Sequence, residues 1–168
     1  MLKKPETTIR FSLNVDGTPT GETLVLSRPT DFVHIARVKA SLRHAINTWM
    51  STEFYKRLMA RNVLEALATG GNEEAAAELA ELDGDWSVPE SDVCAQEMFA
   101  AVGMEETLAL VTGYEPAEGG EAMTAGEAGV ALRSAPEYRA TLIDLRDLVF
   151  LGFAKAEVAD EETGPDAG

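Results

Sequence analysis

The spacing of apolar residues changes once along the chain, and this change limits the possible folds. Residues 9–15 and 22–28 alternate apolar and polar side chains with a period of two, which is typical of half-buried strands. After residue 30, apolar residues recur three and four positions apart, as on amphipathic helices. The sequence therefore predicts a mainly α-helical α+β protein, with an N-terminal β-hairpin followed by five to six helices.

The hairpin is expected over residues 8–28. Gly17 and Gly21 favour a loop over Asp16–Gly21, because glycine adopts a positive φ without steric cost. A hairpin alone is only marginally stable in water, so one of its faces needs a partner. We expect the apolar residues of its first strand to pack against the first helix; these are Ile9, Phe11 and Leu13.

A chain of 168 residues is long enough for one domain, which we expect over residues 1–156. Basic amphipathic helices are predicted over residues 30–68, either as two helices or as one long kinked helix. Their inward face would begin at Phe32. Acidic helices are predicted over residues 72–112, and an apolar C-terminal helix over residues 134–156.

Two further segments lack the pattern of a helix or strand. Residues 113–124 are rich in Gly, Pro and Glu, which is typical of a mobile linker, and residues 157–168 read as a disordered acidic tail. Helix starts are marked by two capping-box patterns, Thr124–Glu127 and Ser134–Glu137. Pro136 favours the second of these, since proline suits the first helical turn.

Charge is segregated between the two ends of the chain. Residues 1–63 hold ten basic and five acidic side chains, residues 64–168 hold four and 24, and the whole chain carries −15. Such a charge disfavours non-specific binding to nucleic acid or anionic membranes. The segregation indicates either a solvated acidic surface, a basic end that meets an acidic partner, or an acidic end that imitates a polyanion.

The basic residues of the predicted helices form a candidate basic face. We expect them to complement the acidic helices or tail of the same chain rather than a nucleic acid, which the acidic remainder would repel. They are Arg37, Lys39, Arg43, Lys56, Arg57 and Arg61.

The residue types needed for chemistry are sparse. Cys94 is the only cysteine, which excludes an internal disulfide, and we expect it to face the core of its helix. His34 and His44 are ten residues apart and do not share a helix face. No phosphate-binding loop or nucleophile elbow occurs. We therefore predict no catalytic residue, cofactor or metal, and a protein that is not an enzyme. Without a signal peptide or a long apolar run, the chain is expected in the cytoplasm and not in a membrane.

The last predicted helix has more apolar residues than one buried stripe requires. Leu142, Leu145 and Val149 define an inward stripe. Further apolar residues lie beside it and form the candidate protein interface: Phe150, Leu151 and Phe153. A helix that is apolar on more than one face is either central to a core or shared with a partner, such as another protein or a second copy.

Residues 8–50 resemble a known family in their organisation. A hairpin turn at Val15-Asp16-Gly17 leads into Leu24-Val25-Leu26-Ser27-Arg28-Pro29-Thr30 and then into helices. This order is similar to that of the tail assembly chaperones of long-tailed bacteriophages. The resemblance implies a non-catalytic protein in the host cytoplasm that binds tape-measure and tail-tube proteins, and it carries over no site residue.

Three function classes remain open from the sequence. The first is a non-enzymatic protein-binding or assembly protein, which would use an apolar surface. The second is a virion structural subunit, such as a head–tail connector component, which would remain in the finished particle. The third is an acidic inhibitor that mimics nucleic acid and presents its acidic residues on one rigid face.

Overall fold

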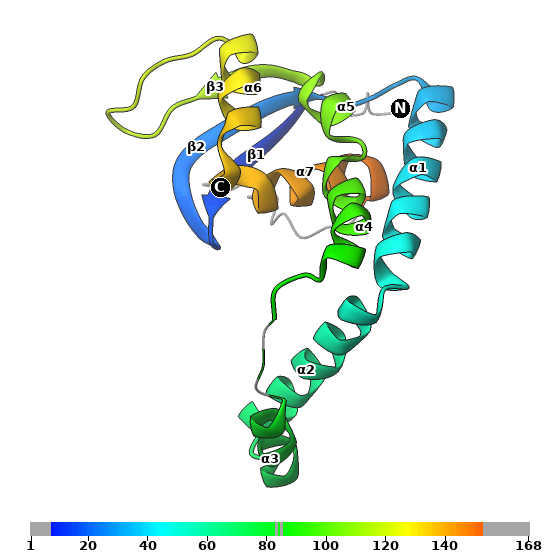
Figure 1. The fold of residues 1–168 in the computed structure, drawn as a ribbon. Coiled ribbons are helices and arrows are strands. Elements are labelled where there is room, and N and C mark those ends of the chain that lie inside the picture. Colours follow the sequence, from blue (N-terminus) through cyan, green and yellow to red (C-terminus); the bar gives the residue numbers. More distant parts are fainter. Residues whose placement is uncertain (1–7, 83, 85, 153–168) are drawn as a thin grey trace, which may run out of the picture. The chain divides into compact units, whose positions relative to one another are not determined.

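A computed structural model describes residues 8–82, 84 and 86–152 (Figure 1). It confirms an α+β fold with an N-terminal β-hairpin. In chain order the elements are β1 (Thr8–Val15), β2 (Thr18–Ser27), α1 (Phe32–Met50), α2 (Glu53–Thr69), α3 (Glu73–Glu81), α4 (Glu90–Ala101), α5 (Met104–Leu108), β3 (Val111–Glu115), α6 (Ala125–Ser134), the 3₁₀ turn η1 (Pro136–Tyr138) and α7 (Arg139–Leu151).

The hairpin turn is tighter than the expected loop over Asp16–Gly21. Asp16 and Gly17 alone form it, with φ of 50° and 77°, and Val15 already pairs with Thr18. Two successive positive φ angles define the type I′ turn, whose twist matches that of paired strands. The Asp-Gly dipeptide is therefore the turn signal, and the residues after it belong to β2.

A bulge in β2 explains the second glycine. Ser12 pairs with Thr23 and Asn14 with Pro19, so three residues of β2 lie opposite the single residue Leu13. Gly21, at the middle of this bulge, has a φ of 83°. A bulge of this kind redirects the neighbouring side chains.

A third strand, β3, extends the hairpin into an antiparallel sheet with the order β1-β2-β3. It occupies part of the expected linker over residues 113–124, so that prediction is wrong for residues 113–115. Gly113 pairs with Val25, and a Cβ at Gly113 would lie 3.5 Å from the Cβ of Val25. Glycine and proline around a short strand concealed it in the sequence.

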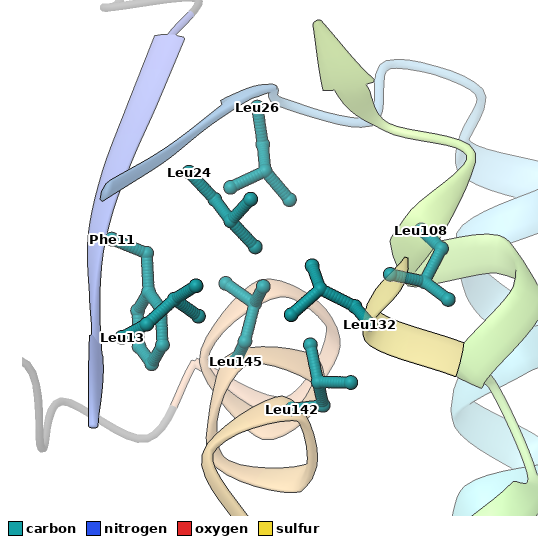
Figure 2. Close-up of a cluster of buried hydrophobic side chains, with 8 residues drawn as sticks. All are labelled: Phe11, Leu13, Leu24, Leu26, Leu108, Leu132, Leu142 and Leu145. Atoms are coloured by element: carbon teal, nitrogen blue, oxygen red, sulfur yellow. The ribbon is translucent and has the colours of Figure 1, made fainter. Parts of the chain in front are cut away.

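The described residues group into two compact units, residues 8–39 with 103–152, and residues 40–82, 84 and 86–102. The single domain expected over residues 1–156 stays a prediction, because two compact units can belong to one domain. The first unit contains the sheet. Figure 2 shows its core, where one face of the hairpin meets side chains from three helices: Phe11, Leu13, Leu24, Leu26, Leu108, Leu132, Leu142 and Leu145.

The helix that covers the hairpin differs from the expected one. Phe11 and Leu13 of β1 are buried with Leu142 and Leu145 of α7, and among the described residues the cluster includes none from α1. The expectation that the first helix covers the hairpin is therefore wrong. Phe32, expected on the inward face of α1, is 85% exposed. Contacts between distant parts of the chain decide this pairing, and periodicity does not reveal them.

The second unit contains the end of α1 together with α2, α3 and α4. The predicted basic segment, residues 30–68, forms two helices. The break lies at Ser51 and Thr52, where the Thr52 hydroxyl accepts a hydrogen bond from the Tyr55 N–H at 3.2 Å and caps α2. The acidic helices predicted over residues 72–112 are present as α3, α4 and α5, and they end before β3 begins at Val111.

The C-terminal helix begins later than predicted. Thr124 and Glu127 form the expected capping box at the start of α6. Ser134 instead ends α6, with its hydroxyl bonded to the Val130 carbonyl oxygen, so the second predicted box is absent. The helix expected over residues 134–156 becomes η1 and α7. Residues 153–156 and the tail over 157–168 lie outside the described residues.

Candidate functional site

The candidate interface on the last helix is only partly located by the structure. Phe150 is 1% exposed, so its expected role as a partner-facing residue is wrong. Leu151 is half-buried. Phe153 lies outside the described residues. At least one of the apolar residues that lie beside the inward stripe of α7 therefore belongs to the core.

The candidate basic face is divided between the two units. Arg37 and Lys39 lie in the first unit and the other four residues in the second. Lys56 forms an exposed ion pair with Glu53 one turn earlier, at 2.7 Å. Arg57 and Arg61 take a different partner, an aromatic ring. Within the second unit, Lys56, Arg57 and Arg61 thus each have a partner from the same unit.

Trp86 is the aromatic ring that receives both arginines. The guanidinium carbons of Arg57 and Arg61 lie 5.2 Å and 4.9 Å from its ring centroid. Cations at this distance are attracted by the ring face, by about 0.5–1 kcal/mol each at exposed sites. This cluster ties α2 to the segment before α4. The sequence shows the arginines four residues apart but not their aromatic partner.

Helix α2 is packed on one side. Its buried residue is Phe54, whose ring lies 6.0 Å from that of Trp49. The Phe54 N–H also donates to Asp92 at the start of α4. Helix α3 contacts α2 and is capped by Asn72, whose side chain accepts from the Ala75 N–H at 3.0 Å. The contacts of Phe54 define the side of α2 that faces inward.

The opposite side of α2 carries an apolar surface that we call the α2 stripe: Met59, Val63 and Leu67. They are 42%, 56% and 47% exposed. Val63 follows Phe54 by nine residues, which is about 900° at about 100° per residue, and so lies half a turn away from it. Exposed alanines flank the stripe at positions 60 and 66. Apolar side chains aligned over two turns form a continuous patch rather than scattered exposure.

A signal for the α2 stripe was present in the sequence. The apolar residues of this helix fall into two series, Phe54 with Leu58 and Leu64, and Met59 with Val63 and Leu67. One helix face cannot hold both series, because the second is rotated from the first by roughly half a turn. The spacing alone does not show which of the two series is buried.

A second notable site lies in the first unit and is polar. We call it the Glu22 cluster, and it consists of the Glu22 carboxylate and the hydroxyls of Tyr114 and Tyr138. The hydroxyls of Tyr114 and Tyr138 both donate to the Glu22 carboxylate, Tyr114 at 2.6 Å. Burial opposes ionisation of Glu22, but these hydrogen bonds outweigh it and lower its pKa. Burial and then the bond to Glu22 raise the pKa of Tyr114 to about 12. For Tyr138 the bond to Glu22 is the larger cause, again with a pKa of about 12.

This arrangement stabilises the fold of the first unit. The two phenols stay protonated as donors, and the carboxylate stays ionised as their acceptor. Glu22 lies in the β2 bulge, Tyr114 on β3 and Tyr138 in η1, so the cluster joins three segments. Because each partner holds the others in their ordinary charge states, the site favours a structural role over proton transfer.

Other kinds of site were sought in the same residues. Within residues 8–82, 84 and 86–152, no group of three or more His, Cys, Asp or Glu side chains could hold a metal ion. Among the described helices, none has the length and apolar content needed to cross a membrane. Cys94, expected to face the core, is exposed. Comparisons with protein-family models, curated proteins and solved structures give no significant match.

Proposed function

We propose that this chain is a non-enzymatic protein-binding protein that acts through the α2 stripe. The observation that carries the proposal is the exposure of Met59, Val63 and Leu67 on the side of α2 opposite its packed side. Fully burying such side chains contributes about 1.5–3 kcal/mol each. A partner that covers the stripe would therefore gain substantial free energy without any change in the fold of α2.

The surroundings of the stripe support recognition of protein. Helix α2 is held by its Thr52 cap, by α3 and by the arginines stacked on Trp86, so the stripe is presented on a preformed helix. A helix that docks into a groove or onto another helix does so through apolar residues spaced four positions apart, as they are in the α2 stripe. Binding in the cytoplasm is part of this proposal. Its narrower form is the tail assembly chaperone that residues 8–50 resemble, which would bind tape-measure and tail-tube proteins.

Site-specific photo-crosslinking tests the proposal. A photoreactive amino acid at position 63 of the full chain, made in the cells that naturally produce it, should give protein adducts. Position 130 is the matched control, because Val130 is also an exposed valine on a helix, at 60% against 56%. Adducts at 63 and few at 130 would support the proposal. No protein adduct at 63, or equal adducts at both positions, would contradict it.

A further inference from the structure

We infer that the occupant of the α2 stripe is the α2 stripe of a second copy of this chain, packed antiparallel about a two-fold axis at Val63. This rests on the proposed function and names the partner. Two-fold contacts are self-complementary: where residue i meets residue j of the partner, j also meets i. Antiparallel helices centred on Val63 place each residue opposite the one equally distant on the other side.

The residues around Val63 have the symmetry that such a contact requires. Four positions to either side stand Met59 and Leu67, both large, and three positions to either side stand Ala60 and Ala66, both small. In the pair, Met59 would meet Leu67 of the second copy and Ala60 would meet Ala66, on both sides of a central contact between the two Val63 side chains. The small alanines allow the helix axes to approach, while the large residues fill the space beside the valines.

The spacing of this face also suits a helix pair. Lys56, Val63 and Gly70 are seven residues apart, with the apolar positions between them at three and four. This is the repeat that keeps one seam facing a partner helix along its length. Gly70 follows the last residue of α2, so the seam ends where the helix ends.

Charge favours this face for contact between two acidic molecules. Each chain carries −15, so two copies repel wherever their carboxylates meet. The stripe contains no acidic residue, and the charged side chain that continues its seam is Lys56. In the antiparallel pair Lys56, which also pairs with Glu53 of its own chain, would lie opposite Gly70 of the second copy, close in sequence to Glu73 and Glu74 at the start of α3. Antiparallel helix dipoles add a small further attraction.

A single pair of 17-residue helices is a small interface. Stable complexes bury about 1,600 Å² in total, so we expect a reversible dimer with a dissociation constant on the order of micromolar. Sedimentation velocity of the full chain over roughly 1 µM to 1 mM should then show a monomer that converts to a dimer as concentration rises. A chain that is monomeric throughout this range would overturn the inference.

Matched variants identify the surface. Val63→Glu should raise the dissociation constant at least tenfold, because it places two carboxylates together on the axis. Val130→Glu, the same change at a comparably exposed position, should leave the constant unchanged. Urea unfolding of both variants verifies that they fold. A dimer that persists in folded Val63→Glu, or that is lost equally in Val130→Glu, would contradict the assignment of the stripe.

Disulfide trapping tests the register without a disruptive charge. In a Cys94→Ser background, which removes the exposed native thiol, Val63→Cys should oxidise to a covalent dimer. Met59→Cys alone should do so poorly, whereas a mixture of Met59→Cys and Leu67→Cys should form the mixed dimer, since disulfides need Cα atoms within about 7 Å. Equal trapping of all three single variants would contradict the antiparallel register.

These outcomes separate the inference from the proposed function. Photo-adducts at position 63 with a different protein, in a chain that stays monomeric, would overturn the second copy as occupant and leave protein binding standing. The absence of both dimer and protein adducts would overturn both. Adducts of twice the chain mass, together with a dimer that is sensitive to Val63→Glu, would support both.

Discussion

Gly103 lies directly against the side chain of Arg146, and a Cβ at Gly103 would stand 3.3 Å from the Arg146 Cδ and 3.4 Å from Val38. Arg146 is fully buried, and its Nε donates to Asp147 at 2.9 Å. Gly103 also has a φ of 76°, in the left-handed region that favours glycine. The start of α5 is thus shaped by a glycine that leaves room for a buried guanidinium.

Replacing this glycine should therefore destabilise the protein for two reasons. Gly103→Ala should lose about 1–2 kcal/mol from the left-handed backbone alone, with a further loss from crowding against Arg146. Gly17→Ala is the control, because Gly17 has a φ of 77° and nothing within 4 Å of its Cβ position. Urea unfolding measures both variants. If both variants lost the same free energy of unfolding, crowding against Arg146 would contribute nothing and this prediction would be contradicted.

Phe150 should behave as a core residue. Phe150→Ala should lower the free energy of unfolding by about 3–5 kcal/mol, since it leaves a cavity where a buried ring stood. The neighbouring substitution Leu151→Ala removes a half-buried side chain and should cost less. Urea unfolding compares the two. A small loss for Phe150→Ala would return this residue to the list of exposed interface candidates.

The Glu22 cluster predicts how stability depends on pH. The pKa values of Tyr114 and Tyr138 are raised to about 12, whereas an unfolded tyrosine titrates near 10. Their contribution to the free energy of unfolding is therefore complete below about pH 10 and is lost as the pH rises toward 12. The pKa of Glu22 is lowered from 4.5, so its contribution is present above pH 4.5 and is lost as pH falls through the folded value.

Unfolding measured between pH 8 and 12 tests the tyrosine part of this cluster. The double variant Tyr114→Phe with Tyr138→Phe should be less stable at pH 8 and should lose less stability than the parent toward pH 12. Tyr55→Phe is the control, at a tyrosine that does not donate to Glu22. Parallel pH curves for the parent and the double variant would contradict the hydrogen bonds to Glu22.

Trp86 should stabilise the second unit through its two arginines. Trp86→Leu keeps an apolar side chain but removes the ring face, and should cost about 1–2 kcal/mol as two cation–π contacts are lost. Arg61→Gln should remove about half of this. Arg43→Gln, at an exposed arginine of α1, should have almost no effect. Thermal unfolding followed by circular dichroism measures all three, and equal effects of the two arginine changes would argue against the stacking.

The hairpin and most helices could be predicted because their evidence is local. Alternation at Phe11 and Leu13 identifies β1, and Thr52 caps α2. Strand β3 could not be predicted, since it exists only through its pairing with β2 and contains Gly113. Helix α7 packs on the hairpin, and Phe150 is buried, because of contacts between segments that are distant in the sequence. Periodicity shows that a face is apolar but not what covers it.

The α2 stripe shows the same limit at the candidate site. Its residues are apolar in the sequence, but an apolar side chain on a helix can be either buried or exposed. Only the structure, in which Phe54 is buried, shows that Val63 is left exposed. A finer reading of the helix rotation would have separated the two series but would not have shown which one is buried.

The rate at which a thiol at position 63 is alkylated tests the central claim most directly. Val63→Cys in the Cys94→Ser background should react rapidly in the dilute purified chain, because the position is exposed. In a concentrated extract of the cells that make the protein, with the chain raised to about 1 mM, the rate should fall at least tenfold as a second copy or another protein covers the α2 stripe. Val130→Cys should react equally fast in both. Equal rates at position 63 in the dilute chain and in the extract would contradict binding through this surface.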